Sequence, residues 1–511
     1  MKKSSAITIF CLLIICSAMP ALVGYLLSNG DSVFSGVVFN PIDGYTYLAK
    51  MEIGSAGDWL FSLPFTASPG EGRLLFPFYI MAGQFFQIVG VPLSAGFNIL
   101  RLLAYGCLVL VLFRLADCIF QDKTDSRGLS VFLMAAGGGL GWLLLPFGKY
   151  GADFWVSEAF PFLAGLANPH FPLALALMVF SVILFKHPKT GWRRLVFGLI
   201  AIFLSILSPF GFVLMSFVLI FAWVWERLDG QSSALLPVLI FVTAGLPYSI
   251  YQYWAVGSTP QLVAWTAQNQ TPSPQIWDVL LSFSPWILLI FVGWRYVYAL
   301  KNNPVVRRLI IWVIVGLLLT VIPYNLQRRF MIGLSIPITS LGLLVLPTIA
   351  PQLKISIRKF LPICAAATIP TTILILLMVS FAIGTRTPMY YYQWDELKAV
   401  EWLSQQKDGK ALVLASDQSG LFIPAVSRLR VLYGHPFETV DAENEKQSVT
   451  DFFTGKLNLA AEKDYLKRKR VNWIFYGQRE SELGVPGIIN GRVPSMQFGS
   501  VKIFDVAEFK D

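Results

Sequence analysis

The chain has 511 residues, of which 55% are hydrophobic and only 14% are charged. Repeated apolar runs, long enough to cross a bilayer, exclude a string of ordinary soluble domains for most of this length. The formal net charge is +10, but residues 384–511 hold 17 basic and 17 acidic side chains, so the excess lies among the apolar runs. Positive-inside topology explains such an excess, and no nucleic-acid partner is expected.

The N-terminal sequence MKKSS precedes an apolar run that has no convincing small-x-small cleavage site, so we expect an uncleaved signal-anchor. All five cysteines lie in apolar runs, and their spacing matches neither a disulfide framework nor a metal site. Eleven runs approach the ~20 residues that a crossing helix needs. They are 6–28, 98–120, 129–147, 160–185, 195–208, 210–226, 234–255, 277–300, 306–322, 330–349 and 361–383.

The run 74–90 allows two topologies. If it crosses the membrane, the basic loop 186–194 lies outside. If it lies along the outer interface, the short inside loops carry 15 Lys and Arg and the outside connections carry five. This asymmetry favours an interfacial helix, with the N-terminus in the cytoplasm and the C-terminus outside. The two apolar segments within 195–226 are short and allow an alternative. If they form a re-entrant pair, the orientation of every later span is inverted.

After residue 383 the composition changes to mixed polar and apolar. Strand-like runs occur at 411–416, 430–434, 472–477 and 500–506, and helix-like stretches at about 393–406, 446–455 and 460–470 separate them. The sequence thus predicts a polytopic α-helical membrane protein of about eleven spans with a small C-terminal extracytoplasmic α/β domain. The expected domains are 1–383, which includes an outer loop 29–97 with interfacial helices, and 384–511.

The stretch 40–60, NPIDGYTYLAKMEIGSAGDWL, combines an acid in a turn, a helical pattern and a second acid turn. Asp43 follows Pro41 and precedes Gly44, at a chain bend where an Asp can cap the next helix. Tyr45 begins the helical spacing, and Trp59 suits a membrane–water boundary.

This arrangement resembles the first outward loop of the GT-C glycosyltransferase superfamily, whose members use sugars linked to lipid phosphates. In that superfamily an acid opens the loop, a tyrosine-bearing helix follows and a Gly-Asp-Trp turn closes it. The matching residues here are Asp43, Tyr45, Ala49, Gly57, Asp58 and Trp59. The string SDQSGLFIPAVSRLRVLYGHPFET also looks like the tail of bacterial members.

Glycosyl transfer from a lipid phosphate needs a carboxylate that takes the acceptor's proton and positive charge that stabilises the leaving phosphate. Asp43 is the candidate base, and a turn-capping Asp is the plain alternative. Tyr45 is a candidate substrate-binding residue. Arg328 and Arg329 break the positive-inside pattern and are candidate phosphate ligands, with snorkelling to outer headgroups as the alternative.

The predicted outer loop 148–172 is a second candidate patch. Asp153 and Glu158 suit a divalent cation such as Mg²⁺ or Mn²⁺, and His170 is a candidate for binding sugar or phosphate. A histidine beside a proline kink is equally compatible with a structural role, and we expect His187 and His435 to be structural. The resemblance implies that this acidic loop helps to bind metal or phosphate.

These features predict a GT-C-type enzyme, hexosyl- or pentosyltransferase, in a prokaryotic plasma (inner) membrane. It would move a sugar from a polyprenyl-phosphate-linked donor to a glycan, lipid or protein acceptor on the outer face, with inversion. Two alternatives stay open: a transporter or flippase for a lipid-linked solute, and a catalytically silent scaffold of the same fold. A transporter would favour internal repeats and ionisable residues near mid-membrane, and the sequence displays neither.

Overall fold

The computed structural model describes residues 3–120, 126–185, 191–231, 234–406 and 411–509. These residues form two compact units, each built from separate parts of the chain. The first unit comprises 1–20, 98–251 and 271–381, and the second comprises 21–97, 252–270 and 382–511. The predicted outer loop therefore belongs to the same unit as the C-terminal residues.

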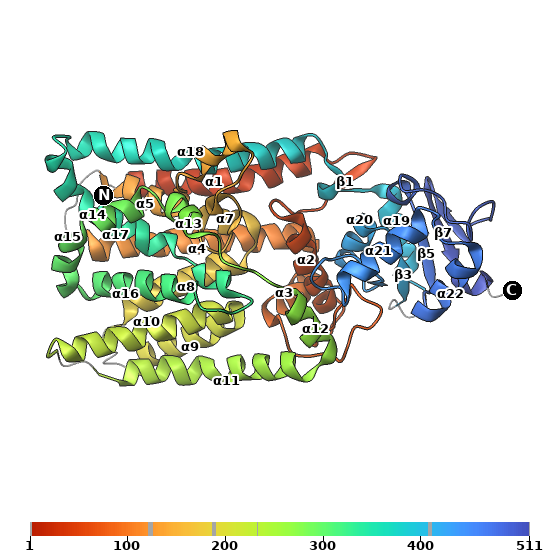
Figure 1. Ribbon diagram of the computed structural model, residues 1–511, viewed down its shortest axis with the longest axis horizontal. Coiled ribbons are helices and arrows are strands. Elements are labelled where there is room, and N and C mark those ends of the chain that lie inside the picture. The colour runs from red at the N-terminus through yellow and green to blue at the C-terminus, as the bar shows by residue number, and fades with distance from the viewer. Residues whose placement is uncertain (1–2, 121–125, 186–190, 232–233, 407–410, 510–511) are drawn as a thin grey trace. The chain divides into compact units, whose positions relative to one another are not determined.

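The first unit is helical (Figure 1). Its helices, some of which continue into the second unit, are α1 (Lys3–Leu27), α4 (Leu93–Ile119), α5 (Ser126–Ala136), α6 (Ala152–Trp155), α7 (Pro161–Ala167), α8 (His170–Leu184), α9 (Gly191–Leu207), α10 (Pro209–Leu228), α11 (Leu236–Ser258), α13 (Ile276–Ser282), α14 (Trp286–Val292), α15 (Trp294–Ala299), α16 (Pro304–Leu319), α17 (Ser335–Gln352) and α18 (Ile357–Gly384).

Five segments among the described residues are long and apolar enough to cross a membrane: Ser5–Leu27, Leu93–Ile119, Pro209–Leu228, Gln327–Gln352 and Ile357–Gly384. A pair of helices bent by 45°, Arg127–Ala136 and Gly141–Phe147, gives a sixth if it counts as one span. Two further predicted spans are broken helices. The run 160–185 divides into α7 and α8, and 277–300 divides into α13, α14 and α15. The count of eleven therefore stays a prediction.

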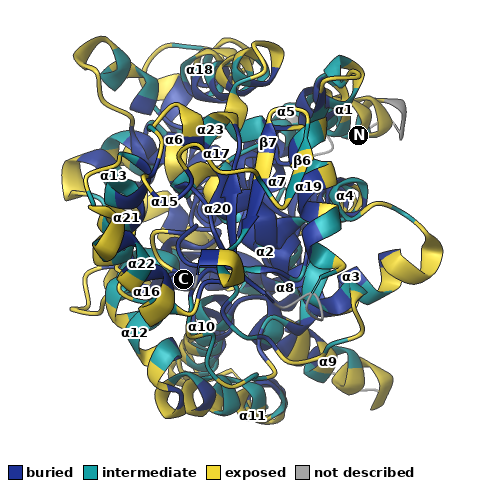
Figure 2. Ribbon diagram, turned by 90° about the vertical axis from the view of Figure 1, so that its right-hand side faces the viewer, coloured by how far each residue is buried: buried dark blue, intermediate teal, exposed yellow. Residues whose placement is uncertain are grey.

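Burial separates inner from outer helices in the first unit. Within Gln327–Gln352, which contains α17, 83% of the most apolar window is buried, against 22% for the window in α1. The α17 helix packs on α5, α14 and α16, while α10 packs on α8, α9 and α16. Exposed residues run along α11 and α18 (Figure 2). Exposed apolar faces on long helices are typical of contact with lipid.

The second unit is built around α2 (Pro41–Ser55), which crosses α3 (Pro77–Val89) with their backbones in contact. A Cβ atom on Gly54 would lie 2.0 Å from the carbonyl oxygen of Ile80, and one on Gly83 would lie 1.9 Å from that of Met51. Only glycine allows this approach. At 13 residues, α3 is about 20 Å long, too short to cross the bilayer alone, which agrees with an interfacial helix.

The C-terminal part of the second unit holds a five-stranded sheet in the order β4-β3-β5-β7-β6. Strands β4 (Arg430–Val431), β3 (Leu412–Leu414) and β5 (Trp473–Tyr476) are parallel, whereas β7 (Val501–Asp505) and β6 (Met496–Phe498) are antiparallel to their neighbours. All residues of β3 and β5 are buried. Continuous apolar runs of this kind are typical of parallel strands that are covered on both faces.

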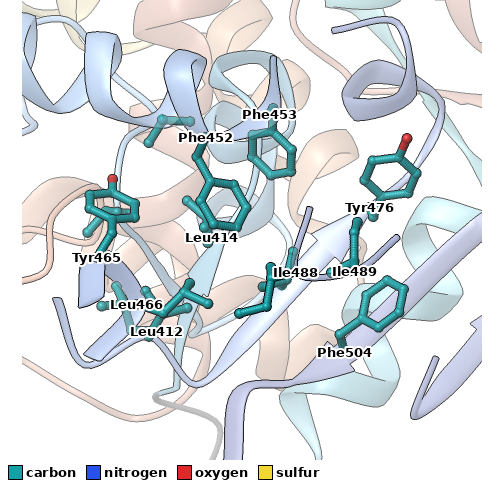
Figure 3. Close-up of a cluster of buried hydrophobic side chains, with 14 of the residues drawn as sticks. Leu412, Leu414, Phe452, Phe453, Tyr465, Leu466, Tyr476, Ile488, Ile489 and Phe504 are labelled. Carbon is teal, nitrogen blue, oxygen red and sulfur yellow. The ribbon is translucent and has the colours of Figure 1, made fainter. Parts of the chain in front are cut away.

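Helices α19 (Trp394–Ser404), α20 (Asp417–Phe422), α21 (Ala442–Phe453), α22 (Leu459–Lys469) and α23 (Gln478–Ser481) accompany this sheet. Its core combines side chains of β3, β5 and β7 with those of α21 and α22 (Figure 3). Leu414, Phe452 and Ile474 are fully buried there. The four predicted strand segments each contain a strand, and the three helix-like stretches each overlap a helix.

One short sheet joins distant parts of the chain. Strand β1 (Ser32–Phe34) pairs antiparallel with β2 (Tyr391–Gln393), with Val33 opposite Tyr392. The backbone N–H of Trp394 also donates to the carbonyl oxygen of Asp31. The segment that follows the first helix is therefore fixed to the segment that follows α18.

Candidate functional site

Asp43 lies in the first turn of α2, at the position that the sequence predicts. Asn40, just before the helix, has a left-handed backbone (φ 49°, ψ 72°), and Pro41 occupies the first turn. The Asn40 side-chain amide donates a 2.6 Å hydrogen bond to Oδ2 of Asp43. The first turn of a helix favours a negative charge. The Asp43 side chain is 49% exposed.

A buried histidine from the C-terminal part faces this carboxylate. Nε2 of His435 lies 3.9 Å from Oδ1 of Asp43, and the imidazole is 3% exposed. Its Nδ1 accepts hydrogen bonds from the backbone N–H groups of Phe437 (3.1 Å) and Glu438 (3.0 Å). An imidazole nitrogen that accepts hydrogen bonds carries no proton, so the proton of the neutral ring is on Nε2, which faces Asp43.

The 434–439 loop, GHPFET, is held by close backbone packing. A Cβ on Gly434 would lie 2.3 Å from the carbonyl oxygen of Gly420, which places this loop directly against α20. The Thr439 hydroxyl accepts hydrogen bonds from the N–H groups of Gly434 and His435. The loop therefore has an internal framework that fixes the ring of His435.

A second contact joins α2 to the same loop. Nζ of Lys50 lies 2.7 Å from Oε1 of Glu438, and both side chains are buried. The ammonium group also lies 4.4 Å from the centre of the Phe76 ring and 5.3 Å from that of Phe61. Lys50 follows Asp43 by seven residues, about two helical turns, so both project from one side of α2.

Tyr45 is buried in the same helix. Its hydroxyl donates to the carbonyl oxygen of Met389 at 2.9 Å, and its ring packs against Tyr392. Burial raises the pKa of Tyr45 to about 12, so the hydroxyl keeps its proton. A substrate contact through this hydroxyl would require it to leave Met389.

The Gly-Asp-Trp turn that ends the motif is also tied to the C-terminal part. Gly57 has a positive φ of 86°, a conformation that favours glycine. Asp58 forms an ion pair with Arg428. Trp59 is exposed.

The first unit brings together two of the predicted residues. Nε of Arg328 lies 3.4 Å from Oε1 of Glu158, and its guanidinium lies 5.1 Å from the centre of the Trp155 ring. The neighbouring Arg329 lies 5.9 Å from the centre of the Phe210 ring. Its Nε is buried and has no hydrogen-bond partner among the described residues. Arg329 thus keeps donor capacity for an anion.

Asp153 lies elsewhere in the first unit and is buried. Its Oδ2 accepts hydrogen bonds from Gly139 N–H (2.9 Å), Gly141 N–H (3.3 Å) and the Thr371 hydroxyl (2.8 Å). The Ser282 hydroxyl lies within hydrogen-bond distance of both Asp153 and Asp278. Burial, only partly opposed by these donors, raises the pKa of Asp153 to about 6.

These contacts do not fit a divalent cation held between Asp153 and Glu158. The oxygen atoms of Asp153 face N–H and O–H donors, and Glu158 faces an arginine, whereas Mg²⁺ and Mn²⁺ need several free oxygen ligands. Within the described ranges, no group of three or more His, Cys, Asp or Glu side chains could hold a metal ion. No catalytic step is assigned to a metal.

His170 begins α8 beside the break at Asn168 and Pro169. The Asn168 side chain accepts from the backbone N–H of Phe171 at 3.0 Å, and the His170 ring lies 4.3 Å from that of Phe171. His187 lies outside the described residues.

The structure thus pairs Glu158 with Arg328 in the first unit and Asp43 with His435 in the second. Sequence reasoning missed three residues near Asp43: His435, Lys50 and Glu438. The sequence feature that could have pointed to His435 and Glu438 is the string GHPFET. It follows a predicted strand and is expected to form a loop, and functional residues are concentrated in loops.

No protein-family model matches the chain, and no curated protein matches it in sequence. Solved structures do match. The oligosaccharyltransferase of Archaeoglobus fulgidus, tethered to an acceptor peptide with an NVT sequon, matches with a TM-score of 0.57 and 14% identity over 93% of this chain and 69% of that one. Other structures of that enzyme contain a dolichol-phosphate with an inhibitory peptide, or Zn and sulfate.

Two further structures are similar. The arabinofuranosyltransferase AftD from Mycobacteria matches with a TM-score of 0.51 and 14% identity over 97% of this chain and 40% of that one. ArnT from Cupriavidus metallidurans, in the apo state, matches with a TM-score of 0.50 and 11% identity over 98% of both chains. Similarity at 11–14% identity shows the fold alone, and on this evidence the present chain has a GT-C-like fold. The fold expected from the 40–60 motif is thereby confirmed.

Proposed function

We propose that this protein is an inverting membrane glycosyltransferase that moves a sugar from a polyprenyl-phosphate-linked donor to an acceptor on the outer membrane face. The observation that carries this proposal is Asp43, a half-exposed carboxylate at the start of α2 in a chain with a GT-C-like fold. A lipid-linked donor is supported by the dolichol-phosphate in the oligosaccharyltransferase structure. The donor sugar is a hexose or a pentose, and the acceptor is a glycan, a lipid or a protein.

The proposed reaction is a single displacement. The acceptor's nucleophilic atom attacks the anomeric carbon and forms the new glycosidic bond, while the bond from that carbon to the phosphate oxygen breaks on the opposite face. The configuration is inverted. The acceptor's proton passes to the carboxylate of Asp43, and the bonding electrons leave with the polyprenyl phosphate.

Arg328 and Arg329 are proposed to stabilise the leaving phosphate. Arginine suits this role because its guanidinium donates two parallel hydrogen bonds to phosphate oxygens. Arg329 has a buried Nε without a partner among the described residues, whereas Arg328 is paired with Glu158. Arg329 is therefore expected to contribute more to donor binding. His170 and Tyr45 are proposed to contact the substrate, which for Tyr45 requires its hydroxyl to leave the carbonyl oxygen of Met389. A dependence on Mg²⁺ or Mn²⁺ would need ligands other than Asp153 and Glu158.

The proposed setting is a plasma (inner) membrane, with the N-terminus in the cytoplasm and residues 384–511 outside as a small α/β domain. This orientation is supported by the larger number of Lys and Arg in the connections that are expected inside than in those expected outside. In this setting Asp43 meets the donor at the outer face of the bilayer.

The test is Asp43→Asn in purified protein reconstituted in liposomes. Undecaprenyl-phosphate-linked hexose and pentose donors are supplied in turn, with a cell-envelope fraction as acceptor. Asn keeps the shape of the side chain but cannot take a proton, so transfer should fall by about two orders of magnitude or more, while donor binding persists. The control is Asp31→Asn, an exposed acid of the same predicted loop, which should leave transfer unchanged.

Full transfer by the Asp43→Asn protein would overturn the assignment of the base. Flipping of the labelled lipid without sugar transfer by the wild-type protein would instead identify a transporter. An absence of both activities would favour a scaffold.

A further inference from the structure

We propose that His435 is a positioning residue for Asp43, so that the 434–439 loop is part of the active site. This inference rests on the proposed function of Asp43. It assigns a catalytic contribution to a segment almost four hundred residues away in the sequence, in a region for which the motif itself gives no chemistry.

The two nitrogen atoms of His435 have different surroundings. Nδ1 is occupied by the backbone N–H groups of Phe437 and Glu438, which is sufficient for a structural histidine that shapes a turn. Nε2 is buried and has no hydrogen-bond partner among the described residues. The carboxylate oxygen Oδ1 of Asp43 lies 3.9 Å from this nitrogen. A buried N–H group without a partner costs free energy, so its presence beside a carboxylate needs a reason other than the turn.

An N–H donor at this position would act on Oδ1 of Asp43. The Asn40 amide already holds Oδ2, so a contact from His435 fixes the carboxylate from a second direction. Such a donor favours the ionised form, which is the form that accepts a proton. The distance of 3.9 Å is longer than a hydrogen bond, and catalytic hydrogen bonds are often long before substrate binds. We infer that this contact shortens when donor and acceptor are bound.

The 434–439 loop is held in place by contacts with two other elements, α2 and α12. Lys50, two turns after Asp43, binds Glu438. The Gln268 side chain, from α12 (Pro260–Gln268), donates to the carbonyl oxygens of Phe437 and Thr439. These contacts keep the loop in register with α2, so that His435 and Asp43 meet.

Two substitutions separate the roles of the two nitrogen atoms. His435→Asn keeps an oxygen acceptor near the place of Nδ1 but has no donor at the place of Nε2. His435→Gln extends an amide donor to the ε position. If His435 acts through Asp43, His435→Asn should lower kcat roughly tenfold to a hundredfold, the range of a hydrogen bond to a charged group, with KM for the donor and the melting temperature unchanged. His435→Gln should then return kcat toward the wild-type value.

The double variant Asp43→Asn, His435→Asn should be no slower than Asp43→Asn alone, because the second substitution acts through the first residue. An unchanged kcat in His435→Asn would overturn the proposal. A fall in melting temperature with equal loss in both His435 variants would also overturn it, since that outcome describes a structural histidine.

A readout without turnover keeps this test separate from the proposed function. The chain has three histidines, so ¹⁵N-histidine labelling gives few imidazole signals, and His435→Asn assigns one set. We expect the tautomer protonated at Nε2, and a shift of that resonance in Asp43→Asn protein. A proton on Nδ1, or no response to Asp43→Asn, would overturn the proposal even if sugar transfer is confirmed.

Discussion

Lys50 and Glu438 form an ion pair of 2.7 Å in which both side chains are buried. One end lies on α2, seven residues after the proposed base, and the other lies in the loop that carries His435. Glu438 Oε2 has no hydrogen-bond partner among the described residues, so Lys50 is the main group that compensates the buried charge of this carboxylate. This pair, together with the hydrogen bonds from Gln268, holds the C-terminal loop beside α2.

Breaking this pair on one side should destabilise the second unit strongly. Lys50→Met leaves a buried carboxylate without its partner, at a cost of about 3–5 kcal/mol. Adding Glu438→Gln should recover much of the loss, because no buried charge remains. Thermal unfolding of the full chain in detergent measures both. Lys456→Met, which breaks a pair whose lysine is 63% exposed, is the control and should change little. Equal melting temperatures for Lys50→Met and wild type would contradict the buried pairing.

The α2–α3 crossing should not tolerate a methyl group. Gly83→Ala places a Cβ 1.9 Å from the Met51 carbonyl oxygen, so the helices must separate, which typically costs about 1–3 kcal/mol. Transfer activity should fall as well, since α2 carries Asp43. Gly257→Ala is a matched control because no atom lies within 4 Å of the added Cβ. A Gly83→Ala protein with wild-type melting temperature and activity would show that the helices cross less closely.

Tyr45→Phe separates a structural role from a substrate contact. The change removes the hydrogen bond to Met389, which should lower stability by about 0.5–1.5 kcal/mol. We expect KM for the donor to stay constant if the hydroxyl only serves the fold. A raised KM at unchanged melting temperature would assign Tyr45 to substrate binding. The comparison needs kinetics and thermal unfolding on the same preparation.

Asp153 should make stability depend on pH. Its pKa of about 6 lies above the ~3.9 of an unfolded aspartate, so the folded chain keeps a proton that the unfolded chain has lost. The contribution of this residue to stability is therefore full below about pH 4, declines as the pH rises to about 6, and is then constant. The difference amounts to about 3 kcal/mol.

Asp153→Asn should remove this dependence, raising the melting temperature at pH 7 relative to wild type and much less at pH 4. Asp464→Asn, at a side chain that is 60% exposed, is the control. A lower melting temperature at pH 7 would mean that the hydrogen bonds from Gly139, Gly141 and Thr371 require an ionised carboxylate.

Topology reporters test the proposed orientation. Tags near Gly70 and Gln270 should be accessible from outside, and a tag after Asn302 should report the cytoplasm, because the basic loops are expected inside. Cysteine labelling of intact cells against permeabilised cells reads this directly. A cytoplasmic signal near Gln270 would show that 195–226 is re-entrant.

Much of the fold could be predicted because its signals are local. Long apolar runs predicted most of the helices, and short strand-like runs predicted β3, β4, β5 and β7. The breaks within 160–185 and 277–300 were missed, because a short interruption at Asn168 or Gly293 hardly changes the hydropathy of a long window. Strands β1 and β2 were missed for another reason. Each has three residues, and its partner lies hundreds of residues away.

The candidate site shows the same division. Asp43 could be found from a local turn, helix and Gly-Asp-Trp pattern. Lys50 appears in the sequence as one basic residue of an outer loop, and no neighbouring residue indicates that its side chain is buried. His435 looks like a lone structural histidine because its neighbour Asp43 is distant in the chain. Contacts between distant residues are set by tertiary packing, which periodicity does not report.

The separation between Lys50 and Glu438 is 388 residues. At about 5–20 residues per second, a ribosome needs roughly 20 to 80 seconds to make that length. During most of this interval, α2 has been synthesised but the 434–439 loop that contacts it has not, and β1 lacks its partner strand β2. The surroundings of Asp43 are therefore completed only after Glu438 has been synthesised, so a nascent chain that stops before this residue would reach the membrane with an unassembled site.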